Sequence, residues 1–235
     1  MSAARIDPSA SFTRDGVLRG ARRCASFAFA VSPFGFAYGA KAAASGFTLD
    51  QALLVSAFVF AGASQFAALE IWSSPPPYLS LALVALAINA RHIVQGAALS
   101  PWLFQAPRRA GYASLLVLTD ANFADSQAAY QRGERDFGVF FGGGVAVWLI
   151  WVVSTALGAI AGGALGDLGR FGLDIVVGAV FAMVMVTLLR EGGSRVAAVA
   201  GAASLLLVQG WSPLGWDVVA AAIVGGVAAA AAQGR

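Results

Sequence analysis

The stretch FGVFFGGGVAVWLIWVVSTALGAIAGGA, residues 137–164, decides the fold class of this chain. It lies between Asp136 and Asp167 and contains no charged residue. A helix needs about 20 mainly apolar residues to cross the roughly 30 Å of hydrocarbon in a bilayer. This stretch is longer than that, and the sequence therefore predicts a membrane-spanning helix over Phe137–Ala164.

The composition extends this prediction to the whole chain of 235 residues. Hydrophobic residues make up 59% and charged residues only 11%, whereas soluble domains carry about 25% charged residues. The abundance of glycine is typical of helices that pack closely in a bilayer. Cys24 is the only cysteine and His92 the only histidine, which excludes a disulfide scaffold and a zinc cluster. The fold class is predicted to be an all-α integral membrane protein without a cofactor or metal.

Further apolar runs predict about six to eight membrane segments in total. They are Cys24–Ala44, Gln51–Trp72, Tyr78–Phe104, Phe171–Leu189, Val196–Gln209 and Trp216–Ala232. We expect residues 1–23 to form an arginine-rich cytoplasmic arm and residues 24–235 to form a single membrane transport domain. The short arginine-rich stretches are better explained as topology signals than as a nucleic-acid surface.

The positions of the arginines predict an irregular segment in the first half of the chain. With the N-terminus in the cytoplasm, three complete crossings before Arg108 would leave that arginine outside. One run must then be re-entrant or broken, and Tyr78–Phe104 is the first choice because polar residues interrupt it. Pro33–Ser45 is the alternative. Irregular backbone at membrane depth survives only where protein or a cavity surrounds it, and transporters place their sites there.

A faint internal repeat favours a two-repeat, inverted architecture as a hypothesis. FTLD at 47–50 and FGLD at 171–174 each open an apolar run after a glycine-rich segment. Inverted repeats are common in secondary transporters.

The strongest polar cluster is Asn89, Arg91 and His92 inside the Tyr78–Phe104 run. A charged group at bilayer depth needs a partner or a cavity. The functional interpretation places Arg91 at a substrate carboxylate and His92 in proton transfer. The alternative is a cytoplasmic helix end, with Arg91 extending to the interface.

Two further motifs lie inside apolar runs. Gly62 and Gln65 share a helix face, which indicates either a polar site beside the glycine or a hydrogen bond between helices. Pro33 and Gly35 open a segment in which Gly35 and Gly39 have the G-x-x-x-G spacing. That segment is either a site at a break or, slightly better favoured, a helix-packing surface.

Asp120 lies where an apolar helix start turns polar, in the string TDAN at 119–122. It is interpreted either as a gate or proton carrier, or as an exposed helix cap. No nucleophile elbow, metalloprotease motif or phosphate-binding loop is present, and the chain is not expected to be an enzyme.

Four ordered strings now carry a resemblance. PFGFAYG (33–39), SGFTLDQALLVSAFVFAGASQFAAL (45–69), NARHIVQGAALSPWL (89–103) and LTDANFA (118–124) resemble the AzlC-type branched-chain amino acid permease family. The resemblance implies proton-coupled export of leucine, isoleucine and valine across the bacterial inner membrane, with methionine as a further candidate substrate. It also implies a partner, a small AzlD-type membrane subunit.

The site expected from these motifs combines two sets of residues. Substrate binding is assigned to Pro33, Gly35, Gly62, Gln65, Asn89 and Arg91, and proton coupling to His92 and Asp120. The substrate's aliphatic side chain is expected against Phe58, Phe60 or Phe66. A passive channel and a non-transporting membrane scaffold remain as alternatives, and a homo-oligomer is left open.

Overall fold

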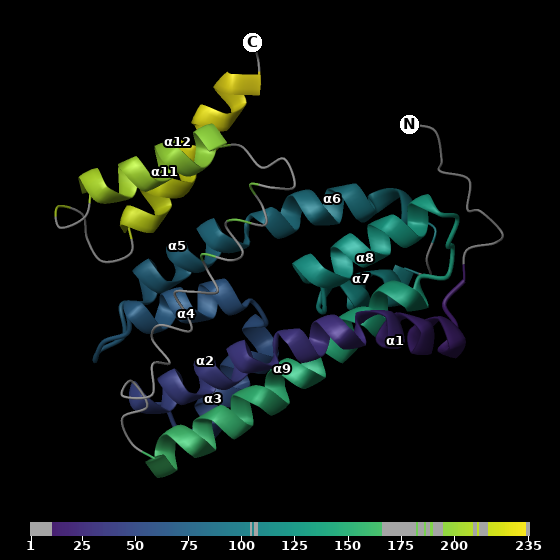
Figure 1. Cartoon of the computed structure of the whole chain (residues 1–235), viewed down its shortest axis with the longest axis horizontal. Coiled ribbons are helices and arrows are strands. Elements are labelled where there is room, and N and C mark those ends of the chain that lie inside the picture. The colour runs from purple at the N-terminus through teal and green to yellow at the C-terminus, as the bar shows by residue number, and fades with distance from the viewer. Residues whose placement is uncertain are drawn as a thin grey trace.

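The computed structural model describes residues 11–103, 105, 108–165, 182, 186, 189, 195–208, 211 and 216–233. The described elements are all helices (Figure 1), and the fold class is therefore α-helical, as predicted. They are α1 (Arg14–Ala30), α2 (Ser32–Ala44), α3 (Leu49–Val59), α4 (Gly62–Glu70), α5 (Tyr78–Asn89), α6 (Arg91–Leu103), α7 (Arg108–Leu115), α8 (Asp120–Gln131), α9 (Gly138–Leu165), α11 (Arg195–Val208) and α12 (Trp216–Gln233). Most of the predicted span Phe171–Leu189, including the second copy of the repeat at 171–174, lies outside the described residues.

The central element is α9, the 28-residue helix that contains nearly all of the decisive uncharged stretch. Helices α1 and α2 lie end to end along it and run parallel to it (Figure 1). Glycines permit this close approach, since a Cβ on Gly20 would lie 1.9 Å from the Val139 carbonyl oxygen and one on Gly39 only 2.0 Å from that of Thr155. The G-x-x-x-G spacing is thus used for packing between helices of this chain.

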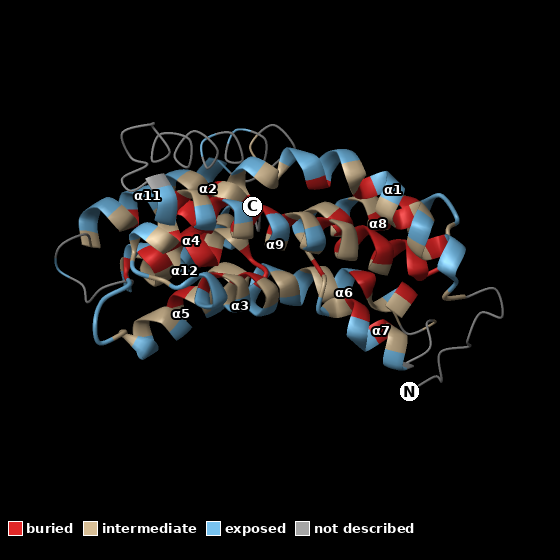
Figure 2. Cartoon of the chain, turned by 90° about the horizontal axis from the view of Figure 1, so that it is seen from below, coloured by how far each residue is buried: buried red, intermediate tan, exposed pale blue. Residues whose placement is uncertain are grey.

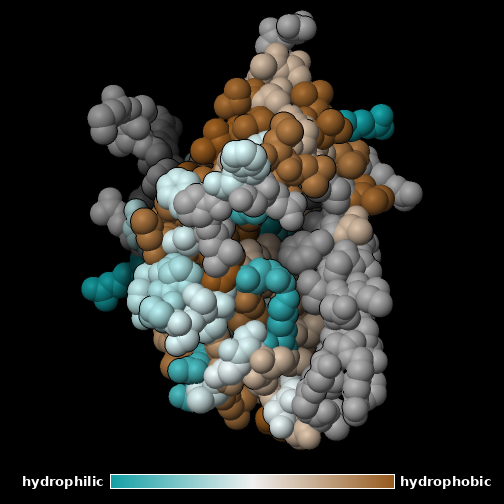
Figure 3. Space-filling view, turned by 90° about the vertical axis from the view of Figure 1, so that its left-hand side faces the viewer, coloured by the Kyte–Doolittle hydropathy of each residue, from teal (hydrophilic) through white to brown (hydrophobic). Residues whose placement is uncertain are grey.

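Two stretches of the described residues are long and apolar enough to cross a membrane, namely Tyr78–Leu103 and Gly138–Ala164. Large hydrophobic side chains are exposed over the outer helices, among them Val199 at 70% and Leu207 at 78%. Figure 3 shows such side chains covering the C-terminal helices α11 and α12, and Figure 2 shows the buried residues gathered inward, along α9 and α4. Outward-facing apolar side chains are expected where lipid is the solvent.

The first three apolar runs are all interrupted. The first is split at Val31, between α1 and α2, the second at Phe60 and Ala61, between α3 and α4, and the third at Ala90, between α5 and α6. Phe60 has φ +37°, a left-handed conformation that costs a non-glycine residue about 1–2 kcal/mol. The predicted break in Tyr78–Phe104 is present at Ala90, and two further runs are interrupted in addition to the one that the positions of the arginines required.

The alternative position for the break, Pro33–Ser45, is continuous helix. Pro33 lies in the first turn of α2, where a missing backbone N–H leaves no hydrogen bond unmade. The proline thus begins a helix and does not interrupt one, and the interruption falls just before it, at Val31.

The predicted boundary at residue 23 falls inside α1. This helix begins at Arg14 with Thr13 as its cap, and its Gly16 and Gly20 face the start of α9. The buried Asp136 carboxylate accepts hydrogen bonds from the Thr13 backbone N–H at 3.1 Å and from the Gly138 N–H at 2.9 Å. One carboxylate therefore caps the N-terminal ends of two parallel helices, whose dipoles both favour a negative charge there.

Candidate functional site

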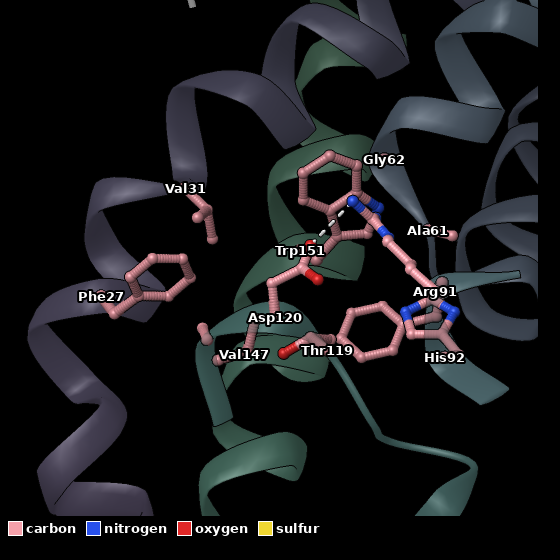
Figure 4. Close-up of a pocket in the computed structure, with 12 residues that line it drawn as sticks. Phe27, Val31, Ala61, Gly62, Arg91, His92, Thr119, Asp120, Val147 and Trp151 are labelled. Atoms are coloured by element: carbon pink, nitrogen blue, oxygen red, sulfur yellow. Dashed lines mark ion pairs between the residues drawn. The ribbon is translucent and has the colours of Figure 1, made fainter. Parts of the chain in front are cut away.

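A pocket lies where the three helix breaks meet the start of α8 and the middle of α9 (Figure 4). It encloses about 140 Å³ and is lined by Phe27, Val31, Phe60, Ala61, Gly62, Arg91, His92, Thr119, Asp120, Ala121, Val147 and Trp151. At 1.5 Å per residue, Val147 and Trp151 lie about 14 and 20 Å from the start of a helix about 42 Å long. The pocket therefore lies near the middle of the spanning helix.

The polar wall of the pocket is an ion pair between two helix starts. Arg91, the first residue of α6, places Nη1 3.0 Å from Oδ2 of Asp120, the first residue of α8 (Figure 4). The other oxygen of Asp120 accepts a hydrogen bond from Gln95 Nε2 at 2.7 Å. Arg91 and Gln95 lie one turn apart on α6, and both side chains contact the same carboxylate.

The TDAN string holds Asp120 in place. Thr119 and Asn122 form a reciprocal capping box, in which the Thr119 N–H donates to Asn122 Oδ1 at 2.7 Å. Asn122 is fully buried, and its Nδ2 donates to the carbonyl oxygens of Val117 and Phe140. The start of α8 is thereby tied to α9, and Asp120, whose side chain is 55% exposed, lies at the pocket in the first turn of this capped helix.

The remaining walls are largely apolar. Phe27 and Val31 come from the α1–α2 junction, Phe60 and Ala61 from the α3–α4 junction, and Val147 and Trp151 from α9. Of the three phenylalanines predicted to contact an aliphatic side chain, Phe60 lines the pocket. Phe58 is 84% exposed, and Phe66 is buried against Tyr38.

Gln65 is fully buried next to the pocket but does not line it. Its Oε1 accepts a hydrogen bond from Trp151 Nε1 at 3.1 Å, and its Nε2 donates to Ser56 Oγ at 3.5 Å. Ser56 Oγ lies 2.7 Å from Thr155 Oγ1, one turn beyond Trp151 on α9. A closed polar chain thus joins α3, α4 and α9, and Gln65 makes the hydrogen bonds between helices that were the alternative interpretation of this residue. It also holds Trp151, which lines the pocket.

Asn89 connects two of the breaks. Its Nδ2 donates to Ser64 Oγ at 3.1 Å, and that hydroxyl donates to the Ala61 carbonyl oxygen at 2.9 Å. Asn89 Oδ1 is buried and has no hydrogen-bond partner within the described part of the chain. The end of α5 is therefore held against the start of α4, and Asn89 supports the pocket without lining it.

Pro33 and Gly35 lie outside the pocket. Pro33 is exposed, and a Cβ on Gly35 would lie 2.9 Å from Ser154 Cβ, so this glycine packs α2 against α9. Of the residues assigned to the site, Gly62, Arg91, His92 and Asp120 line the pocket, and the rest lie behind it or elsewhere.

Sequence reasoning missed Trp151, the largest pocket residue from α9. Its side chain lies in the middle of an uncharged run, where an indole is unremarkable by composition. One signal was available, because an indole N–H at membrane depth needs a hydrogen-bond acceptor. Gln65, an amide inside the apolar run Gln51–Trp72, was a candidate for that acceptor. Among the described residues, no group of three or more His, Cys, Asp or Glu side chains is arranged to hold a metal.

Comparison with known proteins now identifies the family. The AzlC protein family profile matches residues 26–165, more than half of the chain. The chain belongs to the AzlC family. That is a family of membrane transporters rather than enzymes, and the resemblance of the four motifs is confirmed.

Two relatives are membrane proteins as well. An uncharacterized membrane protein of Archaeoglobus fulgidus is 32% identical over 195 residues, covering 82% of this chain and 84% of that relative. The inner membrane protein YgaZ of Escherichia coli is 30% identical over 136 residues, covering 57% of this chain and 56% of YgaZ. No solved structure matches the chain. The AzlC-family chain is thus a membrane protein.

Proposed function

We propose that this AzlC-family protein exports the branched-chain amino acids leucine, isoleucine and valine across the bacterial inner membrane, with methionine as a further candidate substrate. The observation that carries the proposal is the Arg91–Asp120 ion pair in a pocket whose remaining walls are largely apolar, near the middle of α9. Such an arrangement is complementary to a small molecule that has both charges at one end and an aliphatic group at the other.

The two charges match an amino-acid zwitterion one by one. The Arg91 guanidinium offers paired donors to the substrate's carboxylate, and the ionised Asp120 carboxylate is an acceptor for its ammonium group. The aliphatic side chain then lies among Val31, Val147 and Phe60. The volume of about 140 Å³ is close to the roughly 150 Å³ of a cavity that holds benzene, which favours a single small amino acid over a peptide.

Proton coupling is assigned to Asp120 and His92. Protonation of Asp120 removes the negative charge that pairs with the ammonium group, which weakens the binding of the substrate. His92 lines the same pocket directly after Arg91 in the chain, and an imidazole can both accept and donate a proton. A proton entering the pocket in exchange for a substrate would link the two movements.

Two further features belong to the proposal. A small AzlD-type membrane subunit is the proposed partner, as the family resemblance implies. The N-terminus is placed in the cytoplasm, since arginines cluster before the first apolar run and after the third.

Efflux of preloaded radiolabelled leucine tests the proposal. Cells would carry this chain alone, the chain with an AzlD-type subunit, or neither, each with and without a protonophore. We expect rapid efflux with both chains and its collapse when the proton gradient is removed. Leucine efflux equal to that of cells without either chain, at normal expression of both, would contradict the proposal.

A further inference from the structure

The Trp151 indole forms one wall of the pocket, which we call the floor, and contacts on several sides fix its position. The Trp151 indole lines the pocket, yet the residue is only 7% exposed. Its six-membered ring lies against Gly62, because a Cβ built on that glycine would be 2.7 Å from Trp151 Cη2 and 3.2 Å from Cζ2. Only a residue without a side chain leaves room for the indole at the first turn of α4.

The five-membered ring of the indole is held by a hydrogen bond. Trp151 Nε1 donates to Gln65 Oε1, and Gln65 is itself held by Ser56. Tyr38, also buried, stacks on the indole with ring centroids 6.5 Å apart and the planes at 23°. Rotation of the indole would break the hydrogen bond and leave a buried amide oxygen unpaired, which costs about 1–3 kcal/mol.

We propose that Trp151, held in place by Gly62 and Gln65, is the specificity-determining residue that limits the size of the side chain this pocket accepts. The inference rests on the proposed function and adds to it the residue that selects among amino acids. Trp151 contacts the substrate's side chain, while Gln65 acts through Trp151 as a positioning residue. A rigid floor accepts aliphatic side chains up to the size of leucine and excludes aromatic ones.

The test uses two variants, one that should make the pocket smaller and one that should make it larger. Gly62→Ala adds a methyl group where the indole now lies and pushes it toward the pocket, so leucine should lose affinity relative to alanine. A misfit of one methyl group in an apolar pocket changes discrimination by about 10-fold or more. Trp151→Phe combined with Gln65→Met shortens the floor and removes both partners of the hydrogen bond, which avoids an orphaned amide. This double variant should bind phenylalanine.

The matched control is Gly96→Ala, the same chemical change at a glycine with nothing within 4 Å of its added Cβ. Membranes containing the full chain, with its small subunit where efflux requires one, would be assayed for binding of radiolabelled leucine. Unlabelled alanine, valine, leucine and phenylalanine compete for the site, and the readout is the rank order of their affinities. That order is insensitive to a general loss of folded protein.

The outcomes separate the two proposals. A shift of about tenfold toward alanine in Gly62→Ala, absent in Gly96→Ala, together with phenylalanine binding by the double variant, supports the floor. Leucine binding by the native chain with an unchanged rank order in both variants would overturn the floor and leave the proposed function standing. Absence of binding of any amino acid by the native chain would overturn both.

Discussion

Replacement of Arg91 by glutamine should change the stability of the protein little and its affinity for substrate strongly. The side chains of Arg91 and Asp120 are 40% and 55% exposed, so their ion pair is an exposed one rather than a buried one. Exposed pairs contribute about 0.2–1 kcal/mol to folding. Arg91→Gln should therefore lower the free energy of unfolding by less than about 1 kcal/mol.

The same substitution should have a much larger effect on binding. A hydrogen bond to a charged group contributes about 1.5–3 kcal/mol, and every 1.4 kcal/mol corresponds to a tenfold change in affinity. The Kd for leucine should therefore rise by roughly 10- to 150-fold. The reciprocal exchange, Arg91→Asp with Asp120→Arg, keeps both charges and should retain more binding than either single exchange.

The assay is thermal unfolding of the purified full chain in detergent, with and without leucine. The native protein should gain a leucine-dependent rise in Tm that Arg91→Gln lacks, while the Tm without leucine is nearly the same. Arg22→Gln, at an exposed arginine of α1, is the matched control and should behave as the native protein. A large fall in the Tm without leucine, combined with an undiminished leucine shift, would refute the assignment of Arg91 to the substrate.

Two further predictions concern the packing that holds the pocket. Asp136→Ala should lower the free energy of unfolding by about 2–3 kcal/mol, because it removes a buried, charged acceptor of backbone N–H groups from two helix ends. Asp15→Ala is the control and should have little effect on thermal unfolding, because the Asp15 side chain is 78% exposed. Equal Tm values for these two variants would count against the capping role. Gly39→Ala places a Cβ 2.0 Å from the Thr155 carbonyl oxygen and should prevent close packing of α2 on α9, while Gly163→Ala, with nothing within 4 Å, should be tolerated. Normal yield and Tm for Gly39→Ala would show that the helices separate without loss.

Polar residues inside apolar runs were good guides to the site. Arg91 and Asp120 cannot remain unpartnered at membrane depth, and this physical constraint is visible in the sequence. Gly62 was found for a related reason, since a glycine beside a polar residue in an apolar run indicates a close contact. The break at Ala90 could be predicted as well, because the polar residues Asn89, Arg91 and His92 surround it inside an apolar run.

The break at Val31 has a local signal, because Pro33 begins the helix that follows it. The break at Phe60 could not be predicted in this way, since the left-handed φ of Phe60 goes against its own preference. Such a conformation persists where the surrounding structure determines it. The same holds for Trp151, whose role depends on Gln65 and Gly62, residues far away in the chain.

Pro33 and Gly35 were assigned to the substrate site from the sequence, but they lie outside the pocket. A proline and a glycine in an apolar run are compatible with a break, a ligand site or a packed helix start, and only the position of α9 decides among them. In this fold Gly35 lies against Ser154, so the motif serves the packing of α2.

The most direct test of the central claim asks whether leucine occupies the pocket between the broken helices. Ala121→Cys places a thiol in the pocket wall, and Ser74→Cys places one in the exposed loop between α4 and α5. The native Cys24 is only 3% exposed and should contribute little background. The measurement is the rate at which a water-soluble methanethiosulfonate reagent modifies each variant, with and without leucine. We predict that leucine slows modification of Ala121→Cys severalfold and leaves Ser74→Cys unchanged, whereas equal rates at Ala121→Cys under saturating leucine would contradict the account.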